Sequence, residues 1–457
     1  MTVFDVAVVG AGVVGSAVAR ELAGYDLTVA LIEAGDDVGD GTSKANTAIL
    51  HTGFDATPGT LESRLVARGY ELLSGYAVRT GIPIERTGAL LVAWTAEEHA
   101  TLTGLQDKAI RNGYRSTELV DAAEVYRRVP SLGPGALAGL TVPDESIICT
   151  WTTTLALATD AVRRGVDLRL RHAVDAVAAD EEYTALHCSN GQTIDARWVI
   201  NAAGLGADSI DRMFGHDRFT VTPRRGELLV FDKQARPLAP TIVLPVPSKL
   251  GKGVLISPTI YGNVMLGPTA EPLADKTATG TTEAGFEFLL DKGRTLMPTL
   301  LDEEVTASYA GLRAAAEHND YVIELDPAQR YLVLGGIRST GLTSSMAVAE
   351  YVRELLDKAG LTLKDKAELP PPPTMPNIGE AFSRPYQDQA AIAADPAYGT
   401  LVCFCERVSA GEIRDALASP LPPADLSGLR RRTRAGNGRC QGFYCGAEVQ
   451  AMLERAR

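Results

Sequence analysis

The stretch Val6-Ala-Val-Val-Gly10-Ala-Gly12-Val-Val-Gly15, near the N-terminus, decides the fold of this chain. Its apolar start predicts a buried strand, its glycine spacing predicts a tight turn, and residues 13–23 predict a helix. A second apolar run, residues 27–32, ends at Glu33. Strand, turn, helix and strand together make a βαβ unit of about 30 residues, the unit that binds dinucleotides.

Each residue of this motif has a physical reason to be there. Gly10 permits the turn, Gly12 lets the backbone approach a pyrophosphate, and Gly15 allows the helix to pack closely on the strand. The helix start offers backbone N–H groups and a favourable dipole to the pyrophosphate. Glu33 is placed to accept hydrogen bonds from the adenosine ribose. The motif itself does not distinguish FAD from NAD.

Two other segments favour FAD. Residues 41–53 are small and polar, have no evident packing role, and follow the ribose acid directly, as the lining of an extended cofactor would. Residues 335–343 join a strand to a second helix, whose N-terminus could face the flavin N1/O2 edge and stabilise the charge of reduced flavin. The residues expected to line the cofactor in these segments are Thr42, Ser43, Asn46, Gly336, Gly341, Leu342 and Thr343.

Composition limits the function classes. The chain has 457 residues, 22% of them charged, and a net charge of −13, which argues against nucleic acid as a partner. No apolar run reaches the ~20 residues needed to cross a bilayer, and the first residues do not resemble a signal peptide. We therefore expect a cytoplasmic protein in which structural disulfides are rare.

The middle of the chain changes character. Between residues 219 and 323, short β-type runs are separated by Pro and Gly, which predicts an antiparallel sheet inserted into an α/β body. The expected fold class is thus α/β, with α+β character in the insert. The expected parts are a discontinuous Rossmann-like FAD-binding domain (1–85, 140–217 and 325–362), a substrate domain (86–139 and 218–324), a Pro-rich linker (363–398) and a small C-terminal iron–sulfur domain (399–457).

Four of the six cysteines form two close pairs near the C-terminus, Cys403-Phe-Cys405 and Cys440-Gln-Gly-Phe-Tyr-Cys445. A [2Fe-2S] cluster takes two thiolates per iron, whereas zinc sites prefer cysteines two to four residues apart. The spacing therefore favours a [2Fe-2S] cluster over the two alternatives, a zinc site and disulfide bonds. The other two, Cys149 and Cys188, are expected to be plain buried or half-buried thiols.

Arginines are dense between the two cysteine pairs. They would favour the reduced form of a cluster or form a docking face for an acidic partner. The arginines concerned are Arg430, Arg431, Arg432, Arg434 and Arg439.

Several motifs together resemble a known family. They are the glycine turn, the segment around His51, Pro143-Asp-Glu145, Asn201-Ala-Ala-Gly204, Pro223-Arg-Arg-Gly-Glu227, Tyr309-Ala-Gly-Leu-Arg313 and Gly336-Ile-Arg-Ser-Thr-Gly341. These resemble the D-amino-acid-oxidase-like flavoproteins, and within them the glycerol-3-phosphate dehydrogenase/oxidase branch. The tail from Arg431 to Cys445 is similar to the bacterioferritin-associated-ferredoxin-like [2Fe-2S] domain. The resemblance implies FAD and a [2Fe-2S] cluster as cofactors, with Cys403, Cys405, Cys440 and Cys445 as the cluster ligands.

The resemblance also implies catalytic residues. His51 would lie beside the flavin, where an imidazole of near-neutral pKa suits proton transfer. A structural role for His51, or covalent attachment of the flavin, is the alternative. Arg313 would bind the anionic end of the substrate; the alternative is an arginine on the protein surface. Lys252 would lie near the active site; the alternative is a solvated lysine in a turn.

Further residues of the family pattern concern the cofactor and the substrate anion. Arg338 would lie beside the flavin, unless it is a structural ion-pair partner, and Val174 and Gly204 complete the expected cofactor site. Ala314 follows Arg313 where many relatives carry proline. One arginine would satisfy a carboxylate as well as a phosphate, so the nature of the anion stays open.

The expected function is an FAD-dependent dehydrogenase that oxidises a small anionic secondary alcohol, best represented by sn-glycerol 3-phosphate going to dihydroxyacetone phosphate. Electrons would leave singly through the cluster toward a partner protein or a quinone-linked subunit, which would provide any membrane contact. Alternatives are an L-2-hydroxy acid dehydrogenase, an amine or imino-acid oxidoreductase, and a non-catalytic electron-transfer subunit. The exact substrate, the acceptor, the oligomeric state, covalent binding of FAD and the position of the cluster are left open.

Overall fold

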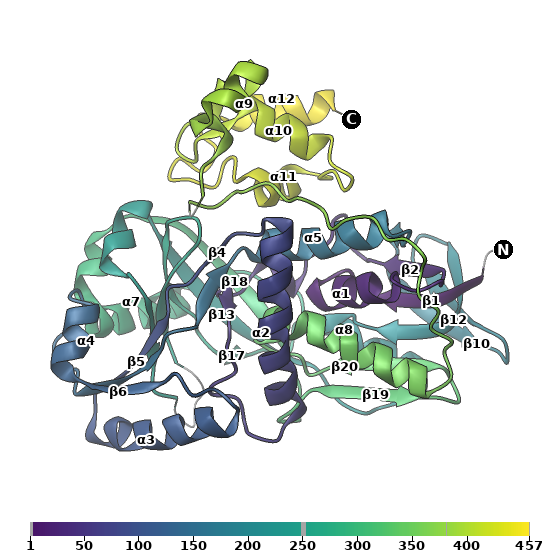
Figure 1. Cartoon of the computed structure of the whole chain (residues 1–457), viewed down its shortest axis with the longest axis horizontal. Helices are drawn as coiled ribbons and strands as arrows, with labels where there is room; N and C mark the ends of the chain where they lie inside the picture. Colours follow the sequence, from purple (N-terminus) through teal and green to yellow (C-terminus); the bar gives the residue numbers. More distant parts are fainter. Residues whose placement is uncertain (1–2, 248–252, 381, 457) are drawn as a thin grey trace.

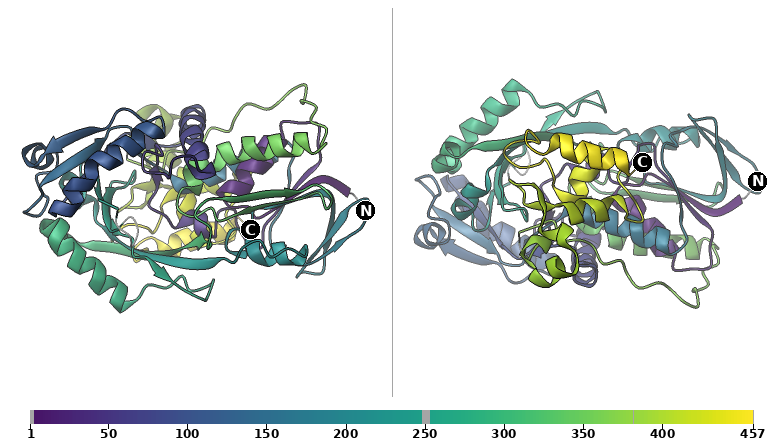
Figure 2. Two further views of the ribbon diagram at one scale, coloured as in Figure 1. Left: turned by 90° about the horizontal axis from the view of Figure 1, so that it is seen from below. Right: turned by 90° about the horizontal axis from the view of Figure 1, so that it is seen from above.

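Two sheets stand side by side in the body of the molecule, and a small helical module sits across their junction (Figure 1). This is a computed structural model, and it describes residues 3–247, 253–380 and 382–456. Seen from above, the module covers the region where the two halves of the body meet (Figure 2). The mixed α/β architecture confirms the expected fold class.

The first sheet contains the predicted nucleotide-binding strands. Its core is parallel, and most residues of β1, β2, β12 and β20 are buried, as in a sheet covered on both faces. In spatial order the strands are β10 (Val174–Ala179), β11 (Thr184–Cys188), β12 (Thr193–Asn201), β1 (Val3–Val9), β2 (Val29–Ile32) and β9 (Asp167–Arg169), with β20 (Tyr331–Gly335) beside β12 and β19 (Val322–Asp326) beside β20.

Four helices pack together over this sheet, and α1 contacts both α5 and α8. Their apolar residues join those of β1 and β2 in the largest hydrophobic core. The four are α1 (Val13–Leu22), α2 (Leu61–Thr80), α5 (Thr150–Arg163) and α8 (Gly341–Lys358), and the shorter α6 (Ala207–Met213) packs with a separate apolar cluster of the same sheet.

The second sheet is mostly antiparallel and has its own hydrophobic core. Its strands in order are β17 (Glu271–Pro272), β13 (Thr222–Phe231), β16 (Val264–Gly267), β15 (Leu255–Pro258), β14 (Ile242–Pro245), β5 (Ala89–Ala93), β7 (Ala138–Val142) and β6 (Glu118–Asp121), with the long β18 (Val305–Ala315) beside β13. The helices that accompany it are α3 (Ala96–Arg111), α4 (Ala122–Arg128) and α7 (Glu283–Leu296).

A small third sheet, β3 (Ile49–Leu50), β8 (Ser146–Ile148) and β4 (Ile84–Glu85), joins the two halves. Strands β3 and β8 run antiparallel, and Leu50 is paired with Ser146. One step beyond that pair, the register sets His51 opposite Glu145. This small sheet therefore positions the side chains of His51 and Glu145 next to each other.

The module consists of β21 (Leu401–Cys403), β22 (Val408–Ser409), α10 (Ala410–Leu417), α11 (Leu426–Thr433) and α12 (Gly446–Arg455). Within the predicted linker, the structure differs from expectation in its last third. There, η5 (Pro385–Gln387), α9 (Gln389–Ala394) and η6 (Pro396–Gly399) form short helices that pack on the module, and the Tyr398 hydroxyl donates a hydrogen bond to Asp415 at 2.6 Å.

The proline-rich part of the linker is held against the body. The Asp26 N–H donates to the Lys364 carbonyl at 2.7 Å, and the Met375 N–H donates to the Thr80 carbonyl at 2.7 Å. The chain between body and module is therefore fixed at several points. No helix in the described part of the chain is long and apolar enough to cross a membrane.

Candidate active site and cofactor sites

The glycine turn joins β1 to α1 with the geometry that its sequence predicts. Gly10 has φ +105°, and a Cβ there would lie 2.5 Å from the Ala202 carbonyl oxygen, so a side chain is excluded. A Cβ at Gly15 would lie 1.8 Å from the Gly10 oxygen. At Gly12 the nearest atom would be the Ser43 hydroxyl at 3.2 Å. The turn is thus packed tightly against the sheet and opens toward residues 42–46.

Glu33 lies at the end of β2, beside this turn. One carboxylate oxygen accepts from the Ala11 N–H at 2.8 Å and the other from the Gly35 N–H at 2.8 Å. The Val13 N–H, at the start of α1, donates to the Ser43 hydroxyl at 3.0 Å. The ribose acid, the helix start and the expected cofactor-lining segment therefore meet at one edge of the sheet, where nucleotides bind in open α/β folds.

Residues 42–46 bridge the two halves of the body. The Thr42 hydroxyl donates to the Leu312 carbonyl at 3.0 Å, and the Asn46 carbonyl accepts from the Tyr309 hydroxyl at 2.7 Å, both in β18. On the other side, the Asn46 amide donates to the Ser43 carbonyl and to the Thr150 hydroxyl. A cofactor lined by this segment would lie between the nucleotide-binding sheet and β18.

The remaining expected cofactor residues occupy neighbouring positions. Gly204 and Gly336 have φ of +57° and +65° in turns that follow β12 and β20, respectively. Gly341 and Leu342 begin α8, and the hydroxyl of the next residue, Thr343, accepts from the His51 backbone N–H at 3.0 Å. Val174 is the first residue of β10. It lies two residues after His172, whose backbone N–H donates to the Glu33 carbonyl.

Arg338 is engaged in a structural contact. Its guanidinium donates to Glu62 at 3.2 Å and to the Asn319 carbonyl at 2.9 Å. Glu62 also accepts from the Thr340 hydroxyl at 2.7 Å, so the pair fastens the turn before α8 to α2. This is the ion-pair role that the sequence left as the alternative, and contact with flavin stays a prediction.

His51 and Glu145 form a pair at the end of the small third sheet. The His51 Nδ1 lies 3.0 Å from one oxygen of the buried Glu145, whose other oxygen accepts from the Thr52 N–H and hydroxyl at 2.7 and 2.9 Å. A carboxylate only accepts, so Nδ1 carries the proton and Nε2 is left as the basic nitrogen. The arrangement is that of a general base oriented by an acid.

Arg313 lies in β18 directly opposite Arg224 of β13. Cross-strand partners share one face of a sheet, and burial together with the Arg224 charge lowers the pKa of Arg313 to about 10. Its only hydrogen bonds among the described residues run to the Thr269 carbonyl at 3.4 Å. A Cβ at Gly226 would lie 2.7 Å from this guanidinium, so glycine leaves the space that it fills.

Two arginines on one face, with no carboxylate paired to either within the described residues, form a candidate anion site. Tyr309 lies on the same face of β18, four residues before Arg313, and its hydroxyl reaches the Asn46 carbonyl. The anion site therefore faces the side of the sheet on which the cofactor-lining segment lies. Lys252, the third expected catalytic residue, lies outside the described residues.

The four terminal cysteines come together in the module. The Cys405 sulfur lies 3.9 Å from that of Cys403 and 3.5 Å from that of Cys440, and Cys445 is buried beside Cys403. A Cβ at Gly438 would lie 2.6 Å from the Cys405 sulfur, and the Gly436 N–H donates to the Cys403 sulfur at 3.4 Å. Four converging thiols with backbone donors fit an iron–sulfur cluster.

The thiols differ in their titration. Burial raises the pKa of Cys403, Cys405 and Cys445, whereas backbone N–H groups, led by that of Tyr444, lower the pKa of Cys440. Cys149 and Cys188 are buried elsewhere in the body, as expected.

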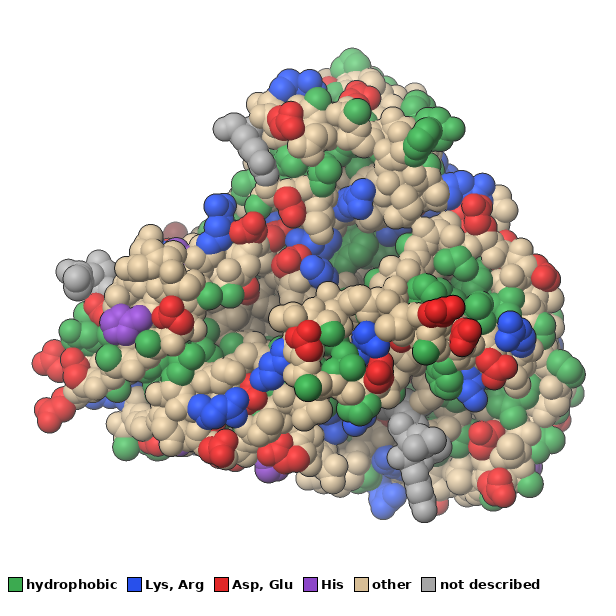
Figure 3. Space-filling model, turned by 180° about the vertical axis from the view of Figure 1, so that it is seen from behind, with side chains coloured by type: hydrophobic (Ala, Val, Ile, Leu, Met, Phe, Trp, Pro, Cys, Tyr) green, Lys and Arg blue, Asp and Glu red, His purple; other side chains and the backbone are tan. Residues whose placement is uncertain are grey.

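The arginines between the cysteine pairs contact the body of the same chain. Arg431 and Arg432 donate to Asp37 at 2.6 to 2.9 Å, and Arg439 donates to Asp232 at 3.2 Å. Figure 3 shows Lys, Arg, Asp and Glu side chains gathered along the boundary between module and body. These arginines are therefore largely used within the chain, rather than presented to an acidic partner.

Arg434 is the central contact of this boundary. It is buried, donates to Glu406 at 2.7 Å, and lies 4.1 Å above the Tyr261 ring. Tyr261 in turn stacks on Trp151 at 5.1 Å, and the Trp151 N–H donates to the Lys44 carbonyl at 3.0 Å. The module thus contacts the body beside the cofactor-lining segment.

Besides Arg224, three residues that make these contacts were given no role by sequence reasoning. Glu145 and Tyr309 stood inside motifs that were recognised, but their partners lie 94 and 263 residues away. Asp37 stood in an unremarkable loop after Glu33, and its arginine partners lie almost 400 residues away in the sequence. A carboxylate such as Glu145 can be recognised as the partner of a histidine only when the pairing of their two strands is known.

A Rossmann-like edge, a base held by an acid and a four-cysteine module define a flavin-dependent oxidoreductase that carries an iron–sulfur cluster. The comparisons agree, since residues 5–355 match the family model described as FAD dependent oxidoreductase and residues 401–455 match the BFD-like [2Fe-2S] binding domain. The chain belongs to this FAD dependent oxidoreductase family, and its cofactors are FAD and a [2Fe-2S] cluster.

Individual relatives narrow the type. The chain is 36% identical over 455 residues to a glycerol 3-phosphate dehydrogenase of Caloramator mitchellensis, covering 99% of this chain and 94% of that protein. It is 31% identical to a glycerol 3-phosphate oxidase of Mycoplasma genitalium, covering 80% and 97%. The structure resembles the FAD-bound L-alpha-glycerophosphate oxidase of Mycoplasma pneumoniae with a TM-score of 0.78 at 29% identity, covering 83% of this chain and all of that one.

Proposed function

We propose that this protein oxidises sn-glycerol 3-phosphate to dihydroxyacetone phosphate and passes the electrons through its [2Fe-2S] cluster to a partner protein or a quinone-linked subunit. The observation that carries the substrate is the Arg224–Arg313 pair. A phosphate monoester carries up to two negative charges, and two arginines at paired positions of neighbouring strands can balance them. A monocarboxylate would leave one of these positive charges uncompensated, and the two carboxylates of 2-hydroxyglutarate lie at opposite ends of its carbon chain. Relatives named for glycerol 3-phosphate support the same choice.

The His51–Glu145 pair supplies the acid–base chemistry. Nε2 of His51 takes the proton of the substrate's C2 hydroxyl, while Glu145 holds the ring through Nδ1 and stabilises the imidazolium that forms. Bound FAD supplies the acceptor for the hydride. Arg313 and Arg224 bind the phosphate and thereby orient the hydroxyl toward His51.

The cysteine loops point to a protein as the acceptor. Phe404, Phe443 and Tyr444, which lie within the two cysteine pairs, are 71%, 84% and 79% exposed. Exposed aromatic side chains beside a redox centre are typical of surfaces that bind other proteins. We therefore place the exit of single electrons at this end of the module.

The test is anaerobic bleaching of the flavin by single substrates. sn-Glycerol 3-phosphate should bleach the flavin absorbance within seconds, whereas L-2-hydroxyglutarate, glycine and proline should not. Bleaching by the hydroxy acid or by an amino acid, with glycerol 3-phosphate inert, would contradict the proposal. A flavin that none of them reduces would identify the chain as an electron-transfer subunit.

Glu145→Gln should slow flavin reduction by glycerol 3-phosphate by about 10²–10⁴-fold while leaving FAD content and KM nearly unchanged. A neutral amide no longer selects the Nδ1–H tautomer or stabilises the imidazolium. Stopped-flow absorbance measures the rate. Asp144→Asn is the matched control, because Asp144 accepts from the Tyr114 hydroxyl at 2.9 Å and does not contact His51. An unchanged Glu145→Gln rate would mean that the pair is only structural.

Cys440→Ser should lose the iron and the cluster absorbance but keep flavin reduction by glycerol 3-phosphate when FAD is added in excess. Serine is a poor substitute for a thiolate ligand, and the hydride step uses none of the module's residues. Iron analysis and anaerobic bleaching of the same preparation measure both effects. Cys188→Ser, at a buried thiol in β11, is the control that should keep its iron. Full iron content in Cys440→Ser would remove this residue from the ligand set.

A further inference from the structure

The loop between β2 and η1 (Thr42–Lys44) is held from two directions. It begins at Glu33 and leads into Ser43 and Asn46, all three of which are predicted to bind FAD, and the Gly39 N–H donates to the Ala11 carbonyl at 2.9 Å in the glycine turn. Its middle carries Asp37, which is buried against the module. One short segment therefore touches both the cofactor site and the iron–sulfur module.

Asp37 is the point of contact between loop and module. It accepts from Arg432 at 2.6 and 2.8 Å in a two-pronged contact and from Arg431 at 2.9 Å, and Arg431 also reaches Asp40 at 2.7 Å. Burial by itself would raise the pKa of Asp37, but Arg432 and Arg431 outweigh it and hold the pKa below its usual value. Removing the arginines would leave a buried carboxylate without compensation, which the loop could relieve only by moving.

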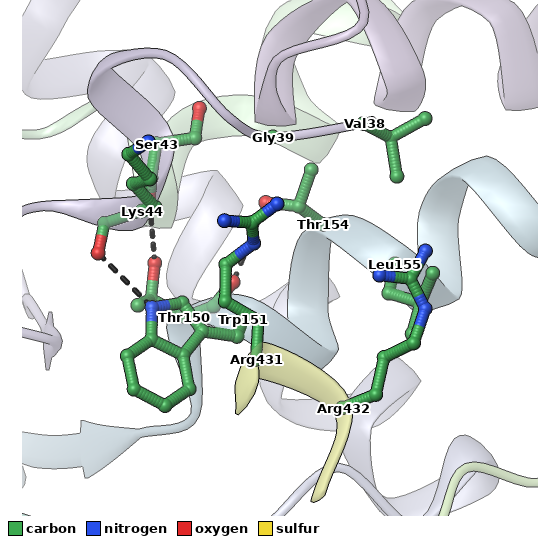
Figure 4. A pocket seen from close by; sticks show the side chains of 10 residues that line it. All are labelled: Val38, Gly39, Ser43, Lys44, Thr150, Trp151, Thr154, Leu155, Arg431 and Arg432. Carbon is green, nitrogen blue, oxygen red and sulfur yellow. Dashed lines mark hydrogen bonds between the residues drawn. The ribbon is translucent and has the colours of Figure 1, made fainter. Parts of the chain in front are cut away.

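A pocket opens at this junction and is lined by both parts (Figure 4). Val38, Gly39, Ser43 and Lys44 contribute from the loop, and Thr150, Trp151, Thr154 and Leu155 contribute from the start of α5. In Figure 4 the side chains of Arg431 and Arg432 extend from α11 toward these two segments. The module is thus the third wall of a space that adjoins the cofactor-lining residues.

We propose that the docked module is a structural part of the FAD site: through Asp37 it holds residues 33–46 in the conformation that binds FAD, so that FAD affinity and module docking are thermodynamically coupled. This rests on the predicted cofactor role of the loop, and not on which substrate the enzyme oxidises. Coupling between two binding events is reciprocal, so whatever docking adds to FAD affinity, FAD adds to docking.

The first test measures the dissociation constant of FAD for the flavin-free, cluster-loaded full chain, by flavin fluorescence. Arg431→Gln with Arg432→Gln should weaken FAD binding by about 5–150-fold, the usual range of allosteric coupling. Iron content shows that the module is still folded. Arg414→Gln, on the exposed side of the module and paired with Asp395 and Asp415, is the matched control and should leave FAD affinity unchanged.

A double-mutant cycle separates this mechanism from direct contact between the arginines and FAD. Asp37→Asn should weaken FAD binding to a similar degree, and combining it with the two arginine substitutions should add little, because all three act through one ion-pair cluster. Additive losses, or an unchanged FAD affinity in the arginine variant, would overturn the proposal.

Hydrogen exchange gives the reciprocal measurement. Adding FAD to the flavin-free protein should slow amide exchange in α11 by a factor comparable to the affinity loss of the arginine variant. Equal exchange in α11 with and without FAD would overturn the coupling. None of these measurements uses substrate, so the bleaching assay can fail for glycerol 3-phosphate while the coupling holds, and the reverse is equally observable.

Discussion

His51→Asn should lower the rate of flavin reduction by sn-glycerol 3-phosphate by about 10²–10⁴-fold, the usual contribution of a general base. Asparagine keeps much of the side-chain volume and can still hydrogen-bond to Glu145, but it cannot accept a proton at neutral pH. The KM should change little, because the phosphate is held by Arg313 and Arg224. Stopped-flow bleaching under anaerobic conditions measures the rate.

Two controls sharpen this experiment. His99→Asn changes an exposed histidine of α3 and should behave as wild type. Acid precipitation of the wild-type protein should release its FAD into solution, since a histidine that acts as a base is not bonded to the flavin. Flavin that stays with the precipitate, and is lost from it in His51→Asn, would assign His51 to covalent attachment. An unchanged rate in His51→Asn would refute the role of base.

Arg313→Met should lower kcat/KM for glycerol 3-phosphate by a factor of about 30 to several thousand, which corresponds to about 2–5 kcal/mol for a partly buried charged hydrogen-bonded contact. Methionine keeps an unbranched chain of similar reach in the space above Gly226 but carries no charge. Arg313→Lys should recover only part of the loss, because a point charge does not reproduce two parallel hydrogen bonds. Arg294→Met, on the exposed side of α7, is the control.

The depressed pKa of Arg313 adds a pH dependence to the same contact. Burial and Arg224 lower this pKa to about 10, so in the free enzyme the guanidinium is charged below that pH and loses its proton above it. Only the charged form attracts phosphate, so wild-type kcat/KM should decline as the pH rises through about 10. Arg313→Met should lack that decline. A wild-type profile that stays flat to pH 11 would show that the guanidinium keeps its proton there, and the loss of kcat/KM in Arg313→Met would then decide by itself whether Arg313 binds the anion.

Much of the nucleotide-binding half could be predicted because its signals are local. The strand, turn and helix around Gly10 follow from a dozen consecutive residues, and residues 335–343 join β20 to α8 as expected. The Arg313 side chain was expected to bind an anion, but its partner Arg224 became apparent only from the β13–β18 register. Pairings between distant strands are set by the whole fold, and no short stretch of sequence encodes them.

Contacts between distant residues also explain why the role of the arginine-rich segment could not be predicted from the sequence. Its composition predicted either a role at the cluster or a site for an acidic partner, and the structure instead pairs Arg431 and Arg432 with Asp37 of the body. Ion pairs between residues so far apart leave no periodicity or spacing to detect. His51 was found through a motif, whereas Glu145 was recognised in a motif but given no role until β3 and β8 were seen to be paired.

The contact between module and body also bears on how this module could be joined to another flavoprotein. A tether alone would give a cluster module that diffuses near its flavoprotein, whereas here an acid at position 37 and an aromatic ring at position 261 receive Arg432 and Arg434 in fixed places. A fusion that joins this module to a shorter flavoprotein therefore needs both receptor positions on the recipient. Such a graft would carry Asp37 and Tyr261 on the recipient and residues 385–456 as the module, because the short helices from Pro385 to Gly399 pack on it.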